Sequence, residues 1–133
     1  MRIDANKNEI VEKDLSYKIV GILFGVHSAL GGTYQEKYYQ RAVEIALKQA
    51  GLKFAKELSG DLLYKDEKIG KYRLDFLIEN RIILELKAVP VVDKADYLQV
   101  RAYLKSANLR LGILANFRGK SLVYKRILNP CGS

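Results

Sequence analysis

The sequence predicts a mixed α/β (α+β) fold in which a central β-sheet is flanked by helices. Two segments with helical spacing of apolar residues come first, a series of β-branched and aromatic-rich segments follows, and one more helical segment precedes the last strands. The chain has 133 residues, 49% hydrophobic and 29% charged, which is ordinary globular composition. This length predicts one domain spanning residues 1–133.

Two helices are expected in the first fifty residues. Apolar residues recur at helical spacing over 15–30, and a second helix is expected over 33–50. Thr33 and Glu36 have capping-box spacing, in which the Glu36 carboxylate bonds back to the N–H of the cap residue. Glu36 also heads the apolar stripe that must pack on the sheet, so its carboxylate could instead point at what the sheet presents. The sequence is compatible with both roles of Glu36, helix capping and pointing at the sheet.

The remaining elements alternate between strands and one helix. Turn-forming residues separate the apolar segments, and Asp93 precedes a helical segment. The expected strands are 52–58, 62–65, 71–78, 81–92, 110–117 and 121–128, and the expected helix is 94–107.

The hairpin formed by 71–78 and 81–92 carries three charges inside an apolar pair of strands: Asp75, Glu85 and Lys87. Side chains alternate along a strand, so Glu85 and Lys87 share one face. A Glu/Lys pair on a solvated strand face is common, and by itself it indicates no site. Two carboxylates beside a lysine could hold a divalent metal ion against a phosphate.

If these three charges form one metal site, the number of residues in the hairpin turn is constrained. Residues directly opposite on a hairpin share a face, so Asp75 must lie opposite Glu85 or Ile83. A two-residue turn would pair Asp75 with Leu84 and divide the three charges between the faces. The metal-site hypothesis therefore predicts a three-residue turn at 79–81, or a bulge.

The net charge of +8 is concentrated in the last third of the chain. No acidic residue follows Asp96, whereas seven basic residues do: Arg101, Lys105, Arg110, Arg118, Lys120, Lys125 and Arg126. Charge of one sign attracts polyanions, which favours nucleic acid as a partner over the alternative of a lysine-rich solvated surface.

A cytoplasmic, non-membrane protein is expected. The one cysteine, Cys131, cannot form a disulfide within the chain. The longest uncharged apolar stretch, 19–26, is too short to span a bilayer, and the polar N-terminus has no secretory signal pattern.

The charged residues taken in order resemble a known family. The carriers of the resemblance include Glu36-Lys37-Tyr38-Tyr39, Leu74-Asp75-Phe76, Ile83-Leu84-Glu85-Leu86-Lys87-Ala88 and the segment Gln99 to Leu104. Over about residues 9–127 the chain resembles the PD-(D/E)xK nuclease superfamily and, within it, the GxxExxY family. Two positions depart from the family pattern: Thr33 replaces a glycine before Glu36, and Leu74 replaces the proline before Asp75.

The resemblance implies a restriction-endonuclease-like core with a mixed four-stranded sheet, and a metal-dependent nuclease acting on DNA. It implies catalytic roles for Asp75, Glu85, Lys87 and Glu36. The metal ion, Mg²⁺ or Mn²⁺, would be held by Asp75, Glu85, Glu36 and the carbonyl of Leu86. Substrate contacts are expected from the following helix, at Gln99, Tyr103, Arg101 and Lys105. The alternatives are a non-catalytic nucleic-acid- or partner-binding module that keeps the fold, and a small junction-resolving homodimer.

Overall fold

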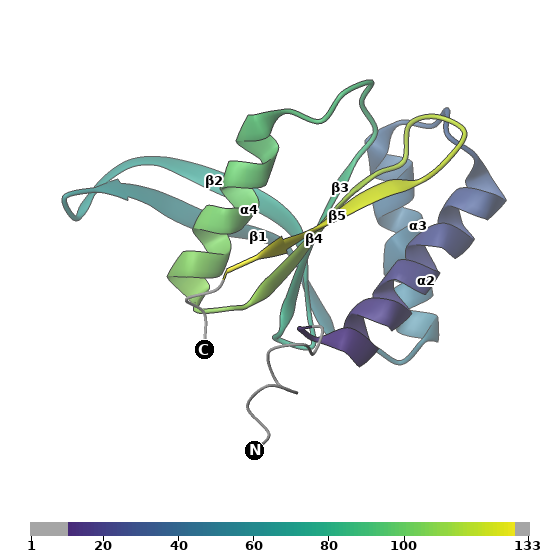
Figure 1. Ribbon diagram of the computed structural model, residues 1–133, viewed down its shortest axis with the longest axis horizontal. Coiled ribbons are helices and arrows are strands. Elements are labelled where there is room, and N and C mark those ends of the chain that lie inside the picture. The colour runs from purple at the N-terminus through teal and green to yellow at the C-terminus, as the bar shows by residue number, and fades with distance from the viewer. Residues whose placement is uncertain (1–10, 130–133) are drawn as a thin grey trace, which may run out of the picture.

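A computed structural model describes residues 11–129 of the chain, which form three helices and five strands (Figure 1). None of the helices in this range is long and apolar enough to cross a membrane. In chain order the elements are α2 (Lys13–Leu30), α3 (Glu36–Gln49), β1 (Phe54–Tyr64), β2 (Glu67–Ile78), β3 (Ile82–Lys87), α4 (Lys94–Ala107), β4 (Leu111–Asn116) and β5 (Val123–Leu128).

The five strands form one mixed sheet in the order β1-β2-β3-β4-β5. Neighbouring strands are antiparallel except β3 and β4, which are parallel and are connected through α4. The expected α+β architecture is confirmed, with five strands where the family resemblance implied four. The expectations for residues 1–10 and for Cys131 fall outside the described residues.

Helices α2 and α3 cover one face of the sheet, and α4 covers the other (Figure 1). On β3, Leu84 and Leu86 pack toward α2 and α3, whereas Ile83 packs toward α4. The larger apolar cluster includes Ile19, Leu23, Val43, Leu47, Phe76, Leu84, Leu86 and Ile113, and the smaller one includes Leu74, Ile83, Val100, Leu104, Leu114 and Ile127. Because both faces of β3 are covered, a charged residue on this strand is buried unless it lies at the strand end.

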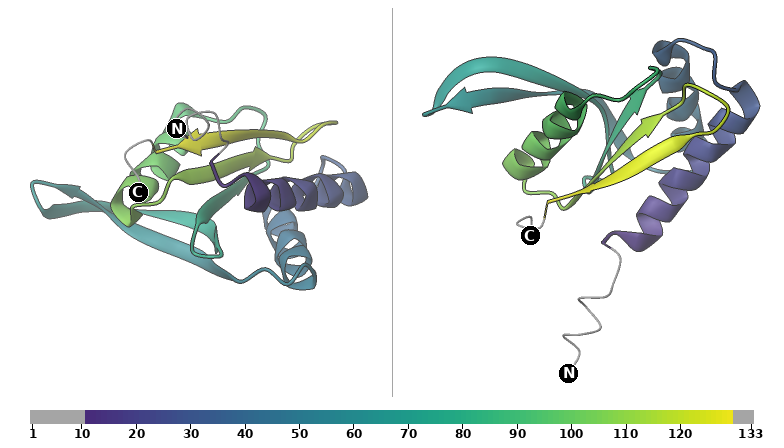
Figure 2. Two further views of the ribbon diagram at one scale, coloured as in Figure 1. Left: turned by 60° about the horizontal axis from the view of Figure 1, so that its bottom comes forward. Right: turned by 45° about the horizontal axis from the view of Figure 1, so that its top comes forward.

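The first hairpin is longer than the sequence predicts. A break was expected at 59–61, but β1 is one strand through this segment, and Gly60 pairs with Tyr72. The Tyr72 ring lies over Gly60, so close that a Cβ on this glycine would lie 2.6 Å from the ring. The cross-strand aromatic residue thus supplies the packing that the small residues lack. The distal part of the hairpin extends beyond the helices (Figure 2).

Two other boundaries also differ from expectation. Helix α3 begins at Glu36, and its N-cap residue Gln35 makes no side-chain capping bond, so the predicted Thr33–Glu36 capping box is wrong. Strand β3 ends at Lys87, well before the expected end at residue 92. Both differences place a charged side chain at the end of an element, next to the adjoining loop.

We expect Gly112→Ala to lower the free energy of unfolding by about 1–3 kcal/mol, because Gly112 lets α4 lie close to β4. A Cβ at this position would lie 2.5 Å from Cγ1 of Val100. Urea denaturation measures the effect. Gly21→Ala on α2 is the control: its Cβ would meet nothing within 4 Å, and alanine should add about 0.5–1 kcal/mol of helix stability. Equal effects of the two substitutions would contradict this account.

Candidate functional site

The turn between β2 and β3 has three residues, as the metal-site hypothesis requires. Ile78 pairs with Ile82 and Phe76 with Leu84, and the N–H of Arg81 bonds to the carbonyl of Ile78 at 3.0 Å. This register puts Asp75 opposite Glu85. The predicted three-residue turn at 79–81 is confirmed.

The side-chain alternation of β2 changes at Asp75. Leu74 packs on the α4 side of the sheet, whereas Phe76, two residues on, packs on the side of α2 and α3. On the neighbouring strand Glu57 has a φ of 56°, and the pairing of β2 with β3 goes no further than Phe76 and Leu84. Such local breaks redirect a side chain. Here the break turns Asp75 into the gap that opens between β2 and β3.

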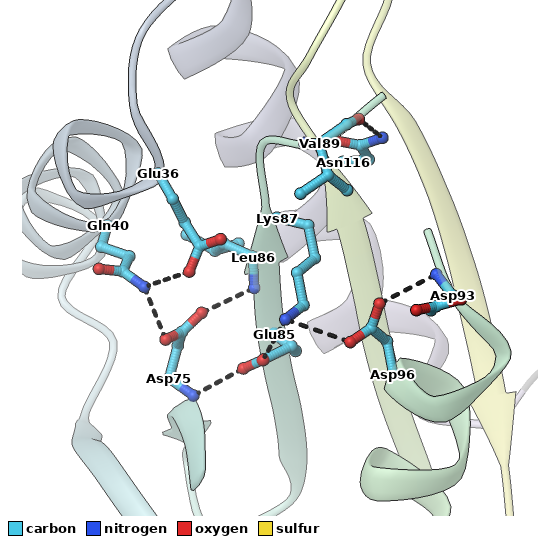
Figure 3. Close-up of polar contacts among 10 residues, drawn as sticks. All are labelled: Glu36, Gln40, Asp75, Glu85, Leu86, Lys87, Val89, Asp93, Asp96 and Asn116. Atoms are coloured by element: carbon cyan, nitrogen blue, oxygen red, sulfur yellow. Dashed lines mark hydrogen bonds and ion pairs between the residues drawn. The ribbon is translucent and has the colours of Figure 1, made fainter. Parts of the chain in front are cut away.

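Two hydrogen bonds cross this gap in place of a regular ladder (Figure 3). The backbone N–H of Asp75 donates to Oε1 of Glu85 at 3.0 Å, and the N–H of Leu86 donates to Oδ2 of Asp75 at 2.8 Å. Each carboxylate therefore accepts a bond from the opposite strand. The carbonyl of Leu86 points to the same side as its N–H, toward the gap, because both groups of a strand residue face the same neighbour.

Helix α3 brings Glu36 to the same place through Gln40 (Figure 3). Nε2 of Gln40 donates to Oε2 of Glu36 at 3.1 Å and to Oδ1 of Asp75 at 2.8 Å. Of the two roles left open for Glu36, the structure supports the one that faces the sheet. Gln40 is absent from the sequence prediction of the site. Its spacing of four residues from Glu36, on the same helix face, is the signal that could have found it.

Lys87 lies between two carboxylates. Its Nζ is 3.6 Å from Oε2 of Glu85 and 3.3 Å from Oδ1 of Asp96 at the start of α4. The other oxygen of Asp96 accepts the N–H of Asp93 at 3.0 Å in a capping box. Asp96 is a second residue that the sequence prediction missed. The Asp93-x-x-Asp96 spacing indicates the capping box, but nothing in the sequence indicates the contact with Lys87.

Backbone and side-chain bonds fix the chain around the end of β3. The carbonyl of Lys87 accepts the N–H of Phe117 at 2.8 Å. The side-chain amide of Asn116 bonds to both the N–H and the carbonyl of Val89, at 3.1 and 2.8 Å (Figure 3). These contacts hold the loop that leads from Lys87 to α4, and so they fix the position of Asp96.

The substrate-binding residues expected on α4 do not contact this cluster. Gln99 is exposed, one turn beyond Asp96, and the half-buried Tyr103 packs its ring edge-on against Tyr72 at 5.9 Å. Arg101 lines a groove beside β5, and Lys105 is exposed. Within residues 11–129, none of these four side chains forms a hydrogen bond or ion pair with Glu36, Asp75, Glu85 or Lys87.

Burial and mutual repulsion perturb the acids of the site. Burial and the charge of Asp75 raise the pKa of Glu85 to about 8, and burial raises the pKa of Asp75. Burial and the charge of Asp75 also raise the pKa of Glu36. Burial lowers the pKa of Lys87, but the charges of Glu85 and Asp96 outweigh this and leave it raised. The cluster favours an added cation, whether a proton or a metal ion.

The donor set fits a hard divalent cation that keeps part of its water. Asp75 and Glu85 offer carboxylate oxygens, and Leu86 offers a carbonyl oxygen at the gap. Among residues 11–129 no three His, Cys, Asp or Glu side chains lie close enough to enclose a metal ion. Mg²⁺ is usually bound in this open way, by one or two carboxylates together with water and substrate phosphate. Mn²⁺ suits the same oxygen ligands.

Comparison with known proteins agrees with this architecture. The family model described as the PD-(D/E)XK nuclease superfamily matches residues 13–127, and the chain belongs to that superfamily. No curated protein matches the sequence significantly. The solved structure titled "Crystal structure of SSO0001" is similar in fold, with 20% sequence identity and a TM-score of 0.53. The match covers 71% of this chain and 50% of that one, so this chain spans half the length of its structural relative.

The free energy of unfolding of the metal-free protein is expected to fall as pH rises from about 5 to about 8. Glu85 titrates near 4.5 when unfolded and near 8 when folded, so the folded protein binds more protons in this interval. Urea denaturation in EDTA at several pH values measures the trend. Glu85→Gln, which keeps an oxygen to accept the Asp75 N–H, should flatten the curve and raise stability above pH 8. If the free energy of unfolding of Glu85→Gln depends on pH as steeply as that of the unaltered protein, Glu85 is not the source of the pH dependence.

Proposed function

We propose that this protein is a metal-dependent nuclease that hydrolyses phosphodiester bonds of DNA, with Mg²⁺ or Mn²⁺ as cofactor. The observation that carries the proposal is the convergence of Asp75, Glu85 and Lys87 at the gap between β2 and β3. Membership of the PD-(D/E)XK nuclease superfamily supports the reaction class. We also propose that the chain forms one domain, acts in the cytoplasm and belongs to the GxxExxY family.

In this proposal Asp75, Glu85 and the Leu86 carbonyl hold the metal ion. The bound ion would polarise the phosphate and lower the pKa of water. The two backbone N–H groups that bond to Asp75 and Glu85 fix the directions of the carboxylates, so that their remaining lone pairs face the gap. Glu36, tied to Asp75 through Gln40, is a further acid that can hold a water molecule or share the ion.

Lys87 supplies positive charge beside the phosphate. Its neighbours Glu85 and Asp96 raise its pKa, so its ammonium group is charged at neutral pH and donates hydrogen bonds. It is therefore suited to orient the attacking water and to stabilise negative charge that develops on the phosphate oxygens. A charged ammonium group is less suited to remove a proton from water, because it has no lone pair to accept one. Gln99, Tyr103, Arg101 and Lys105 of α4 remain proposed contacts to the substrate backbone beyond the cleaved bond.

Lys87→Ala should lower the rate of cleavage at least about 100-fold, because it removes a preorganised charge at the reacting phosphate. The measurement is cleavage of labelled single-stranded, duplex and branched DNA in Mg²⁺ or Mn²⁺. Manganese binding, followed by electron paramagnetic resonance, should persist in Lys87→Ala and be lost in the double variant Asp75→Ala/Glu85→Ala. Binding of DNA without cleavage by the unaltered protein would instead support the non-catalytic module.

Asp96→Asn tests whether Asp96 positions Lys87. Asparagine keeps an oxygen for the Asp93 N–H, so the capping of α4 is preserved while the ion pair with Lys87 is lost. We expect kcat to fall about 10-fold, corresponding to about 1.4 kcal/mol, with manganese affinity unchanged. Asp93→Asn is the control, since it alters the same capping box without touching Lys87. An equal loss in both variants would assign the effect to the helix end.

A further inference from the structure

A groove leads away from the candidate site along α3. It is lined on the helix side by Lys37, Gln40, Arg41 and Glu44, and on the sheet side by Lys56, Glu57, Asp75 and Phe76. Because Gln40 bonds directly to Asp75 at 2.8 Å, the groove and the acid cluster share a wall. A chain-like substrate with one phosphate at Asp75 can therefore continue over the exposed side of α3.

The cations of this groove differ in their pairing. Lys56 bonds to the carboxylate of Glu44 at 2.9 and 3.1 Å, so its charge is compensated. Lys37 and Arg41 form no ion pair with an acidic side chain of residues 11–129. They are four residues apart, so they lie on the same face of α3. These two uncompensated cations favour an anionic ligand on the helix side of the groove, whereas the sheet side carries Glu57, an acid without an ion pair among residues 11–129.

Two exposed tyrosines lie beside these cations. Tyr34 is 49% exposed and Tyr38 is 41% exposed, with their rings edge to face at a centroid distance of 6.1 Å. Nζ of Lys37 and Cζ of Arg41 lie 5.2 and 5.8 Å from the centre of the Tyr38 ring. A single exposed tyrosine is ordinary, but a pair of rings next to uncompensated cations is the combination that binds single-stranded nucleic acid.

Aromatic rings discriminate between forms of nucleic acid. A ring stacks on the flat face of a base, and in a duplex those faces are covered by the neighbouring base pairs. Lysine and arginine contact phosphates in either form. The rings of Tyr34 and Tyr38 therefore suit unpaired nucleotides, whereas Lys37 and Arg41 alone would not distinguish them from paired ones.

We propose that Tyr34, Lys37, Tyr38 and Arg41 bind unpaired nucleotides next to the cleaved bond, so that the substrate is single-stranded or has a single-stranded segment there. This inference rests on the proposed nuclease function for the location of the cleaved bond. Tyr38 stacks on a base, and Lys37 and Arg41 contact the adjoining phosphates. The substrate strand passes over the first two turns of α3 and reaches Asp75 along the wall formed by Gln40.

Binding measured without cleavage tests this inference. Fluorescence anisotropy of a labelled 20-nucleotide single strand and of the same sequence as a duplex, in EDTA, gives two affinities for the full-length protein. We expect the single strand to bind more tightly. Tyr38→Ala should weaken single-strand binding about 10-fold, within the range for losing one stacked base, while Tyr38→Phe retains it. Retention in Tyr38→Phe shows that the ring and not the hydroxyl group is required, and an unchanged urea midpoint of Tyr38→Ala excludes a folding defect as the cause.

The charges are tested by salt dependence. Lys37→Ala/Arg41→Ala should reduce the slope of log affinity against log salt by about 1.4, because two phosphate contacts to a single strand are lost. Matched controls lie on α2: Tyr17→Ala, which removes a ring that is 81% exposed, and Lys13→Ala/Lys18→Ala. Tyr17 is thirteen residues before the end of α2, about 20 Å along the helix axis. These controls should change affinity less than twofold.

The outcomes separate this inference from the proposed function. Tighter duplex binding, or equal losses in the α2 and α3 variants, overturns the single-strand site whether or not the protein cleaves DNA. Failure of the unaltered protein to cleave any substrate in Mg²⁺ or Mn²⁺, together with the expected binding pattern, overturns the nuclease function and leaves a single-strand binding site.

Discussion

The arrangement depends on one constraint: two carboxylates, Asp75 and Glu85, are held side by side in a largely buried gap between strands. Placing like charges together away from water costs free energy. The cost is reduced by the bonds that each carboxylate accepts from the opposite strand and by the nearby ammonium of Lys87. Neither bond would form if the strands continued their regular ladder, so the change of alternation at Asp75 is a requirement of the site.

The turn, the end of β3 and the contacts from the two helix layers all help to hold the two carboxylates in this arrangement. Three residues in the β2–β3 turn put Asp75 opposite Glu85, and the end of β3 at Lys87 lets the loop turn toward α4. The two helix layers then contribute from opposite sides, with Gln40 from α3 on Asp75 and Asp96 from α4 on Lys87. The cluster contains four acids (Glu36, Asp75, Glu85 and Asp96) and one lysine, so it has an excess of negative charge when the acids are ionised. Such a cluster is less stable than an apolar one and retains an affinity for cations, the usual compromise at a functional site.

Features governed by local chemistry could be predicted from the sequence. Helix α4 spans 94–107 as expected because Asp93 caps it. The three-residue turn is predicted only by requiring Asp75 and Glu85 to share a site, because the local turn residues by themselves indicate a two-residue turn. Features governed by tertiary contacts could not. The segment 59–61 resembles a turn, and only the Tyr72 ring on the partner strand keeps it extended. The contact of Asp96 with Lys87 depends on how closely α4 packs on the sheet, which no local pattern reports.

The two helices beside the site also differ in what they present to a polyanion. At the start of α4, Lys87 is paired with Asp96, whereas Arg101 and Lys105 farther along the helix are exposed and have no acidic partner among residues 11–129. At the start of α3, Lys37 and Arg41 have no acidic partner within the described chain, and the groove beside them opens directly on Asp75. The approach along α3 rests on the groove that joins Lys37 and Arg41 to Asp75 and not on charge pairing alone, because Arg101 and Lys105 of α4 also lack an acidic partner among residues 11–129.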